Sequence, residues 1–281
     1  MLIFKKVEQL KSYFAKERKK GKTIGFSPTM GALHQGHVSL VKRSLEETDL
    51  SVCSIFVNPT QFDDKKDLTK YPKTTGQDLD LLHSIGTDVV FLPTVDEIYP
   101  VGQNEPHGFN FGEMAKHMEG AHRDGHFDGM AQVVKRLLEI VEPDFIYMGQ
   151  KDYQQQALVK VMLEQMDTNC QLVRCPIIRE VDGLAMSSRN VRLNKEDRIT
   201  AGSISATLRN AKEEAKSLPL KTVKANALKG LDIPGFSVDY FEIIDAFSLQ
   251  PIAEFEQAES VVACTTVRIG GIRLLDNMIL K

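Results

Sequence analysis

The segment Pro28-Thr-Met-Gly-Ala-Leu-His-Gln-Gly-His37 places two imidazoles three residues apart, at the junction of an expected strand and an expected helix. The amides and the positive dipole end of a helix N-terminus attract phosphate. Gly36 lets a phosphate or an adenine approach the backbone, and His34 and His37 can donate hydrogen bonds to phosphate oxygens as charge builds up. The pattern indicates a nucleotide site. A buried histidine beside a structural or metal-bound histidine would give the same letters.

Two further polar segments offer groups suited to phosphate. In Met148-Gly-Gln-Lys-Asp-Tyr-Gln-Gln155, Lys151 is a point-charge phosphate binder, Asp152 is a candidate helix N-cap, and Gln155 lies one turn further on. The loop Met186-Ser-Ser-Arg-Asn190 offers two hydroxyls and one guanidinium, which suit a polyphosphate. The structural alternatives are an exposed loop lysine in the first segment and an ordinary turn in the second.

A fourth polar segment, Asn58-Pro-Thr-Gln-Phe62, follows a strongly apolar run, so Asn58 and Gln61 are expected at the carboxyl end of a strand. A binding role and a structural role fit these letters equally. Other nucleotide motifs are excluded. The sequence Gly21-Lys-Thr23 has Lys16 where a P-loop needs its first glycine, and no G-x-G-x-x-G fingerprint occurs.

Strands and helices alternate over the first part of the chain. Strands are expected at 23–27, 51–57, 88–92, 145–148 and 171–178, and helices at 37–47, 77–85, 129–141 and 153–166. This alternation predicts an α/β fold with a Rossmann-like parallel sheet and helices on both faces. Because ligands bind at the carboxyl ends of the strands in such a sheet, the four polar segments are expected over one crevice. The long connections at 60–75 and 102–129 are expected to be functional.

The regular alternation of strands and helices is absent at both ends of the chain. After about residue 176, a charged helix at 195–217 is followed by short strands at 240–244, 261–267 and 272–275. This predicts a Rossmann-like, nucleotide-binding domain at 1–176 and a smaller α+β domain at 177–281. At the other end, residues 1–22 are basic, with apolar residues at helical spacing. A docked helix is expected there, and a membrane-surface role is the alternative.

Composition limits the partners and the compartment. Of the 281 residues, 35 are Lys or Arg and 38 are Asp or Glu, a formal charge of −3, so no nucleic-acid partner is expected. The four cysteines form no C-x-x-C pair, which fits a reducing compartment. No apolar run approaches the roughly 18 to 20 residues of a membrane span. A cytoplasmic protein without a membrane partner is expected.

The ordered set of segments resembles a known enzyme family. PTMGALHQGH, FVNPTQF, YPKTTGQDL, GHFDGMAQVV, PDFIYMGQKDYQQ and MSSRN, over nearly the full length, resemble the pantothenate synthetases (pantoate:beta-alanine ligases). These are HIGH-motif nucleotidyltransferases, like class I aminoacyl-tRNA synthetases. The sequence departs from the pattern at Asp124 and Gln132, where Pro and Thr are expected, and Gln35 fills the variable HIGH position.

The resemblance implies a reaction and its residues. ATP and (R)-pantoate would form a pantoyl adenylate, and beta-alanine would convert it to pantothenate with release of AMP and pyrophosphate. His37, His34, Lys151 and Arg189 would be catalytic. The ATP site would comprise Met30, Gly31, Ala32, Leu33, His34, Gln35, Gly36, His37, Gly149, Gln150, Lys151, Asp152, Ile178, Met186, Ser187, Ser188 and Arg189. The small-molecule substrates would be bound by Gln61, Gln155, Asn58, Arg123 and His126.

The resemblance further implies Mg²⁺, held mainly by the phosphates because the sequence has no dedicated carboxylate cage. It also implies a homodimer. Two rival functions are a transferase of the same superfamily with another acceptor, and a nucleotide sensor without catalysis. The contexts of Gln61 and Gln155 disfavour the first, and the complete set of four catalytic candidates disfavours the second.

Overall fold

The computed structural model describes residues 1–100 and 108–281, which divide into two compact units. The first unit comprises Met1–Asn110, Arg123–Gly149 and Leu158–Pro176, and the second comprises Phe111–His122, Gln150–Ala157 and Ile177–Lys281. The expected long connection at 102–129 lies partly outside the described residues. Among the residues described, no helix combines the length and the apolar character needed to cross a membrane.

The first unit contains a six-stranded parallel sheet in the order β1-β4-β3-β2-β5-β6. Its strands are β1 (Leu2–Phe4), β2 (Ile24–Thr29), β3 (Leu50–Ile55), β4 (Val89–Phe91), β5 (Phe145–Gly149) and β6 (Gln171–Cys175). Every residue of β3 is buried, as expected for a central strand covered on both faces. The Rossmann-like fold class is therefore confirmed.

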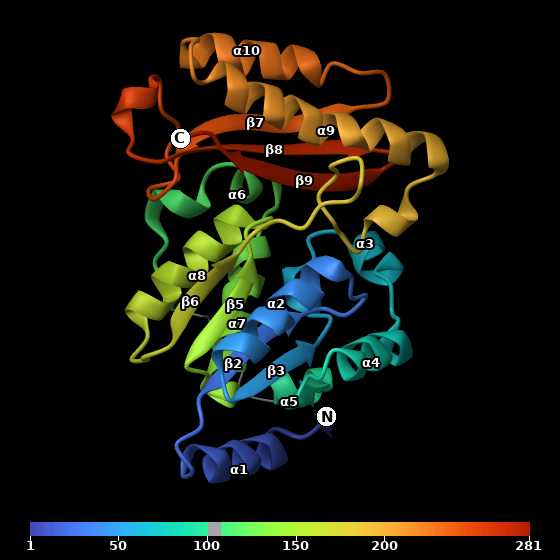
Figure 1. Cartoon of the computed structure of the whole chain (residues 1–281), viewed down its shortest axis with the longest axis vertical. Helices are drawn as coiled ribbons and strands as arrows, with labels where there is room; N and C mark the ends of the chain where they lie inside the picture. The colour runs from blue at the N-terminus through green and yellow to red at the C-terminus, as the bar shows by residue number, and fades with distance from the viewer. Residues whose placement is uncertain (101–107) are drawn as a thin grey trace. The chain divides into compact units, whose positions relative to one another are not determined.

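The helices of this unit are α1 (Val7–Arg18), α2 (Gln35–Glu47), α3 (Lys65–Lys70), α4 (Thr75–Ser84), α5 (Val95–Ile98) and α7 (His126–Val141). The helix α8 (Tyr153–Gln165) leads from the second unit back into the first. Helix α2 lies in front of the sheet and α7 behind it (Figure 1). Val41 of α2 packs with Cys53 and Ile55 of β3 and with Leu82 of α4, and this packing fixes the helix whose first turn contains the His-Gln-Gly-His segment.

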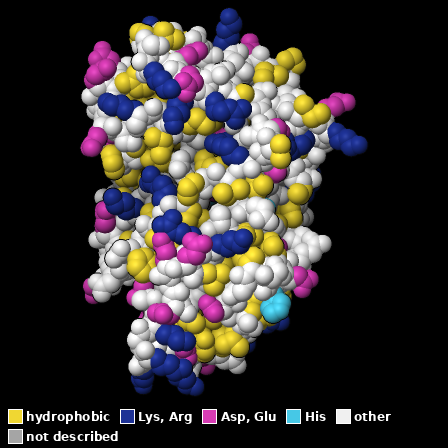
Figure 2. All heavy atoms as spheres, viewed as in Figure 1, with side chains coloured by type: hydrophobic (Ala, Val, Ile, Leu, Met, Phe, Trp, Pro, Cys, Tyr) yellow, Lys and Arg dark blue, Asp and Glu magenta, His cyan; other side chains and the backbone are white. Residues whose placement is uncertain are grey.

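The expected helix over residues 1–22 is wrong at its start. Leu2–Phe4 form the edge strand β1, which pairs with Val89–Phe91, and α1 begins only at Val7. The apolar residues at the start also fit strand geometry, and pairing with β4 decides between the two. Leu10 and Phe14 of α1 are fully buried, so the helix is docked as expected. Lys and Arg side chains gather over α1 at the lower end of Figure 2.

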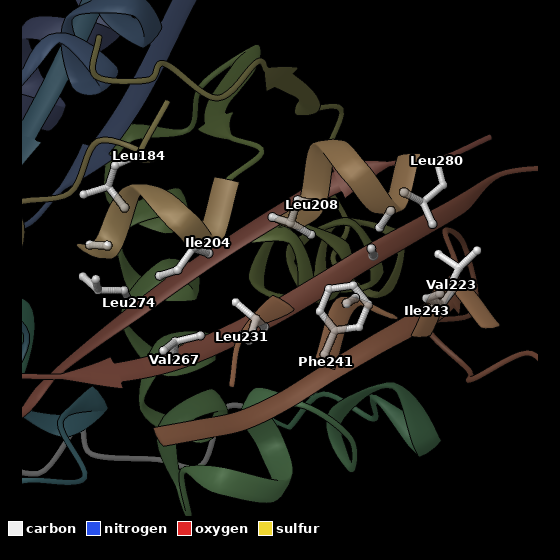
Figure 3. Packing of buried hydrophobic residues seen from close by; sticks show 14 of the residues in the cluster. Leu184, Ile204, Leu208, Val223, Leu231, Phe241, Ile243, Val267, Leu274 and Leu280 are labelled. Atoms are coloured by element: carbon white, nitrogen blue, oxygen red, sulfur yellow. The ribbon is translucent and has the colours of Figure 1, made fainter. Parts of the chain in front are cut away.

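The second unit contains a three-stranded antiparallel sheet, β7 (Ser237–Asp245), β8 (Val261–Ile269) and β9 (Ile272–Ile279), in sequential order. Helices α9 (Lys195–Glu214) and α10 (Leu220–Gly230) contribute to the apolar cluster on one face of the sheet, which Figure 3 shows from close by. The sequence did not predict α10. Pro219, which suggests an interruption, is its N-cap, and Leu220, Val223 and Ala227 form its buried stripe.

Two earlier segments belong to the second unit through buried polar contacts. Glu119 of the short helix α6 (Glu119–His122) forms a salt bridge with Arg273 and accepts hydrogen bonds from the hydroxyls of Tyr240 and Thr266, at 2.8 and 2.9 Å. The other segment, 150–157, contributes Tyr153, whose hydroxyl donates to the carbonyl of Ala246 at 3.1 Å. The compact units therefore differ from two continuous pieces. The domain boundary after residue 176 stays a prediction.

The four cysteines are buried thiols, two in the strands β3 and β8, one at the end of β6, and one before β6. Burial raises the pKa of the Cys53 thiol to about 12 and the pKa of the Cys170 thiol to about 12. It also raises the pKa values of Cys175 and Cys264. A thiol that stays protonated at neutral pH is a poor nucleophile, so these cysteines are structural.

Candidate active site

The segment between β2 and α2 makes a tight left-handed turn. Gly31 has φ +79° and Ala32 has φ +48°, a region that residues with a Cβ rarely adopt. The turn is held by Asp78 of α4, whose carboxylate accepts hydrogen bonds from the backbone amides of Ala32 and Leu33, at 3.0 and 2.8 Å. The Thr74 hydroxyl also donates to Asp78, at 3.1 Å. Asp78 is 3% exposed, so a buried carboxylate sets the path of the chain into α2.

His34 and His37 form a reciprocal cap at the N-terminus of α2. The Gly36 amide donates to Nδ1 of His34 at 3.1 Å, and the His34 amide donates to Nδ1 of His37 at 3.3 Å. The two ring centroids lie 4.0 Å apart. In a neutral imidazole whose Nδ1 accepts a hydrogen bond, the proton is on Nε2. Each ring therefore has an Nε2–H donor beside the helix N-terminus, an arrangement that suits an anionic ligand.

Asn58 and Gln61 follow the carboxyl end of β3, next to β2 in the sheet, as predicted. Asn58 is 1% exposed, and its Nδ2 donates to Oε1 of Gln61 at 3.2 Å and to the carbonyl of Gly129 at 3.1 Å. The hydroxyl of Tyr99 donates to Oδ1 of Asn58 at 2.9 Å. Asn58 therefore orients the Gln61 amide, whose Nε2 lies 3.2 Å from the Met30 sulfur.

Helix α7 packs against this loop at Gly129, where there is no room for a side chain. A Cβ added to Gly129 would lie 2.1 Å from the carbonyl oxygen of Thr60. Any side chain at residue 129 would push α7 away from the short helix η1 (Pro59–Gln61). The absence of a side chain at this position therefore keeps the Gly129 carbonyl within reach of Asn58.

Arg123 and His126 lie beside the same loop. Nδ1 of His126 lies 2.8 Å from the carbonyl oxygen of Gln61, and its Nε2 lies 2.9 Å from Nη1 of Arg123. Arg123 also forms an ion pair with Asp63, with Nη2 2.9 Å from Oδ1. Burial tends to raise the pKa of the Asp63 carboxyl, but the charge and hydrogen bonds of Arg123 hold that pKa below its usual value. Arg123 and His126 thus fix the backbone that carries Gln61.

In the second unit, the segment after β5 begins with Gln150, Lys151 and Asp152. Lys151 Nζ lies 3.4 Å from Oδ1 of Asp152, and the Lys151 side chain is 18% exposed. The Asp152 carbonyl accepts the Gln156 amide at 3.0 Å, so Asp152 stands at the start of α8. Gln155 is half-buried in the first turn of that helix. This agrees with the predicted helix start.

The loop that carries the Met186-Ser-Ser-Arg segment is a closed turn of the same unit. The Met186 amide donates to the carbonyl of Ile178 at 3.0 Å, and Arg179 pairs with Ala185 in an antiparallel bridge. The Arg189 amide donates to Oγ of Ser187 at 3.3 Å. Ile178 and Met186 are therefore neighbours in space, as their common assignment requires, although they lie at opposite ends of this turn in the sequence.

The predicted site residues are distributed over both units. The first unit holds Met30, Gly31, Ala32, Leu33, His34, Gln35, Gly36, His37, Asn58, Gln61, Arg123, His126 and Gly149. The second holds Gln150, Lys151, Asp152, Gln155, Ile178, Met186, Ser187, Ser188 and Arg189. In the parts of the chain that the structure describes, no cluster of three or more His, Cys, Asp or Glu side chains is placed to hold a metal ion.

Sequence reasoning did not identify several residues that support these groups: Asp63, Asp78, Tyr99 and Asn277. Asp78 lies in the segment YPKTTGQDL, which carried the family resemblance without a role, so a signal was present. Tyr99 and Asn277 lie 41 and 127 residues from the partners that they contact, Asn58 and Gln150, and no local pattern announces such contacts.

Comparisons with known proteins give a consistent result. The sequence pattern of the family described as "Pantoate-beta-alanine ligase" matches residues 2–279. The chain is 47% identical to the pantothenate synthetase of Porphyromonas gingivalis over 284 residues, covering 99% of each chain. It is 44% identical to that of Bacteroides thetaiotaomicron over 279 residues, covering 99% of this chain and 98% of the relative.

Solved structures agree with the sequence relatives. The crystal structure of pantothenate synthetase from Thermus thermophilus matches with a TM-score of 0.94 and 35% identity, covering 100% of this chain and 99% of that one. Pantoate-beta-alanine ligase from Francisella tularensis, complexed with beta-gamma ATP and beta-alanine, matches with a TM-score of 0.83 and 35% identity, covering 100% and 98%. The chain therefore belongs to the pantoate-beta-alanine ligase family.

Proposed function

We propose that this protein condenses (R)-pantoate with beta-alanine to pantothenate at the expense of ATP, through a pantoyl adenylate. The observation that supports this most directly is the reciprocal His34–His37 cap at the N-terminus of α2, directly after the strand β2. It provides amides, a positive helix end and two imidazoles where the phosphates of a nucleotide would bind. Family membership supplies the substrates that this phosphate site would serve.

In the first step, a carboxylate oxygen of pantoate attacks the α-phosphorus of ATP. The bond from the α-phosphorus to the bridging oxygen breaks, and pyrophosphate leaves. Most of the barrier is charge and positioning, so preorganised donors are what the protein supplies. His34, His37, Lys151 and Arg189 would stabilise the negative charge that grows on the phosphate oxygens. The backbone amides of α2 and the hydroxyls of Ser187 and Ser188 would hold the phosphates in the ground state.

Gln61 and Gln155 would bind pantoate through its hydroxyls and carboxylate. The side-chain oxygen of Gln61 already accepts from Asn58, and one hydrogen of its Nε2 is directed to the Met30 sulfur, so the second Nε2 hydrogen would be directed toward a substrate oxygen. Asn58, Arg123 and His126 would act through this loop. Their contacts fix Gln61, and the Arg123 charge is offset by Asp63. Arg123 and His126 are therefore better described as supports for the loop than as direct ligands.

In the second step, the beta-alanine amine attacks the acyl carbon of the adenylate. The bond from the acyl carbon to the phosphate oxygen breaks, AMP leaves, and the amine loses a proton to give the amide. Gln61 would also contact beta-alanine. The smaller α+β unit would exclude water from the adenylate, which would otherwise hydrolyse. The homodimer and the cytoplasmic location stay predictions.

The residues present fit Mg²⁺ bound chiefly through phosphate oxygens. Asp152 is the one carboxylate among the residues assigned to ATP, and carboxylate oxygens are ligands that Mg²⁺ accepts. The ion would neutralise charge on the β- and γ-phosphates of ATP. His34, His37 and Lys151 would then have to stabilise only the charge that develops at the α-phosphate.

The test is isotope exchange of pyrophosphate into ATP with the purified full chain. We expect exchange that requires pantoate and does not require beta-alanine, because adenylation precedes amine attack. Exchange that occurs only with beta-alanine would reject the adenylate. Exchange with a different carboxylic acid in place of pantoate would favour a related transferase, and ATP binding without exchange under any condition would favour a nucleotide sensor.

A further inference from the structure

The loop that carries Lys151 is held by one buried side chain from the distant strand β9. Nδ2 of Asn277 donates to the carbonyl oxygens of Gln150 and Lys151, both at 2.9 Å. In return, Nε2 of Gln150 donates to Oδ1 of Asn277 at 3.1 Å. Asn277 is 2% exposed, so these bonds form without competition from bulk water. The two accepting carbonyls are consecutive, and together they fix the backbone from which the Lys151 side chain extends.

The neighbouring residue of β9 holds a second segment assigned to ATP. Asp276 pairs with both terminal nitrogens of Arg179, at 2.6 and 2.9 Å. Arg179 follows Ile178 directly, and its Nη1 also donates to the carbonyl of Gly183 at 3.0 Å. Successive side chains of a strand point to opposite faces, so Asp276 and Asn277 serve different neighbours. A bidentate pair of this kind also fixes orientation.

The contacts made by Asn277 and those made by Asp276 are connected to each other through the backbone of β9. The Asn277 amide donates to Oδ1 of Asp276 at 2.7 Å, and Nη2 of Arg179 donates to the Asn277 carbonyl at 3.3 Å. The segment at 150–151 and the segment that begins at Ile178 are thus connected to the same two residues of one strand. Two adjacent residues of β9 therefore hold both of the second-unit segments that we assign to ATP.

We propose that Asn277 is a positioning residue for Lys151 in the adenylation step. The inference rests on the proposed function. Lysine has a long, flexible stem, so its ammonium is placed only as well as its backbone is placed. A misplacement of about 1 Å at a reacting centre can cost about 100-fold in rate. Removing the two donors of Asn277 frees the backbone at residues 150–151 while leaving the charge of Lys151 in place.

The test compares Asn277→Ala and Asn277→Ser with the matched control Thr265→Val. Thr265 is 1% exposed in the adjacent strand β8, and its hydroxyl donates to the Tyr240 carbonyl at 2.8 Å. The control therefore removes one buried hydrogen bond from the same sheet, and the acceptor of that bond lies in β7 rather than in the Lys151 loop. We expect the Asn277 variants to lower the single-turnover rate of adenylate formation by about 10- to 100-fold, with the KM for pantoate within about twofold. The control should stay within about twofold of the wild-type rate.

A double-mutant cycle that combines Asn277→Ala with Lys151→Ala distinguishes a positioning role of Asn277 from a general loss of structure. If Asn277 acts through Lys151, then Asn277→Ala should change the rate less than about threefold in the Lys151→Ala background, because the group to be positioned is gone. An undiminished loss in that background, or an equal loss in Thr265→Val, would overturn the proposal. If Asn277→Ala does not fold, Asn277→Ser, which keeps a hydroxyl donor at the site, serves in the same cycle.

Hydrogen exchange gives a readout that does not depend on the reaction. Backbone amides at 150–152 should exchange faster in the Asn277 variants than in the wild type and in Thr265→Val, while the amides of β7 should not change. Unchanged exchange at 150–152 would refute the inference that Asn277 holds the backbone of the Lys151 loop. Faster exchange together with an inactive wild type would instead refute the proposed function and leave that inference standing.

Discussion

The side-chain amide of Asn58 donates to Oε1 of Gln61, 3.2 Å away, while the Tyr99 hydroxyl donates to the other end of Asn58 at 2.9 Å. The orientation of Gln61 is thus determined by a buried side chain that is itself oriented by a tyrosine from another part of the chain. A substrate hydroxyl that meets Gln61 would meet a preset donor. Preorganisation of this kind reduces the entropy lost on binding.

We expect Gln61→Ala and Gln155→Ala to weaken pantoate binding far more than ATP binding. A substrate hydroxyl or carboxylate that loses a buried partner costs on the order of 1–3 kcal/mol. Calorimetric titration with pantoate and with ATP measures both affinities. Gln165→Ala, at the end of the same helix as Gln155, is the control. Equal losses for the two ligands would contradict the assignment of these glutamines to pantoate.

Asn58→Ala should reproduce part of the Gln61→Ala defect. The variant leaves Gln61 in place but removes the donor that orients its amide. We expect a loss of pantoate affinity of about 1 kcal/mol, the usual worth of one neutral hydrogen bond. In the Gln61→Ala background this loss should disappear. If Asn58→Ala weakens pantoate to the same degree with and without Gln61, then Asn58 contacts the substrate itself.

His37→Ala and Lys151→Ala should each lower the rate of adenylate formation by roughly 10²–10³, the cost of losing one preorganised donor to a transition state. ATP binding should suffer less, because the helix amides and the loop at 186–189 still contribute. Single-turnover rates measured beside ATP dissociation constants decide this. A loss of ATP affinity in proportion to the rate would make both residues ground-state phosphate binders.

Asp78→Asn should disturb the turn before His34 while leaving every residue proposed to bind ATP in place. One amide hydrogen bond to Ala32 or Leu33 would be replaced by a contact between two donors. We expect a loss of stability on the order of 1–3 kcal/mol in urea unfolding and a lower adenylation rate. Asp80→Asn, an exposed change in the same helix, is the matched control and should match the wild type. If Asp78→Asn has wild-type activity, then the turn held by Asp78 is not needed to position His34 and His37.

The Asp63–Arg123 pair predicts a pH-dependent contribution to stability. The pKa of Asp63 is lower in the folded protein than in the unfolded chain, where it is about 3.9. The stabilisation is therefore present above that value and is lost as the pH falls through the lower folded pKa. The Asp63 side chain is 33% exposed, so the pair contributes at most about 1 kcal/mol.

Thermal unfolding of Asp63→Asn and of the wild type at several pH values measures this contribution. Asp63→Asn should unfold at a lower temperature than the wild type at pH 7, and the difference should shrink toward zero as the pH falls through the folded pKa of Asp63, which lies below the unfolded value of about 3.9. Asp232→Asn, an exposed change, is the control. A difference that persists undiminished in acid would show that the Asp63 side chain contributes by something other than its charge.

The central strands of the first unit were predictable because β3 and β5 are short, largely apolar runs followed by polar loops. The runs SVCSIFV and FIYMG can be recognised as strands from their apolar composition, because a central parallel strand is buried on both faces. The strand β1 was missed because its three residues fit helical spacing equally well, and only pairing with β4 decides. Helix α10 was missed because Pro219 can end one helix or begin another.

The residues that we propose to contact substrates could be selected from the sequence for a different reason: most of them lie in short polar segments at strand ends. Their roles stay predictions. The residues that hold them in place could not be predicted, because these contacts join residues that are close in space but far apart in the sequence. Glu119 contacts Arg273, 154 residues away, and Asn277 contacts Lys151, 126 residues away. No periodicity or local spacing encodes such pairs, and they emerge only when the chain is folded.

The burial of all four thiols has a practical consequence for spectroscopy. Because none of the native cysteines presents a reactive thiolate, cysteines introduced at exposed positions should be the only ones that maleimide dyes modify quickly. Gln9 of α1 in the first unit and Lys229 of α10 in the second are exposed positions outside the proposed site. A donor dye at one and an acceptor at the other would turn the separation of the two units into a fluorescence signal during a catalytic turnover, without first removing any native cysteine.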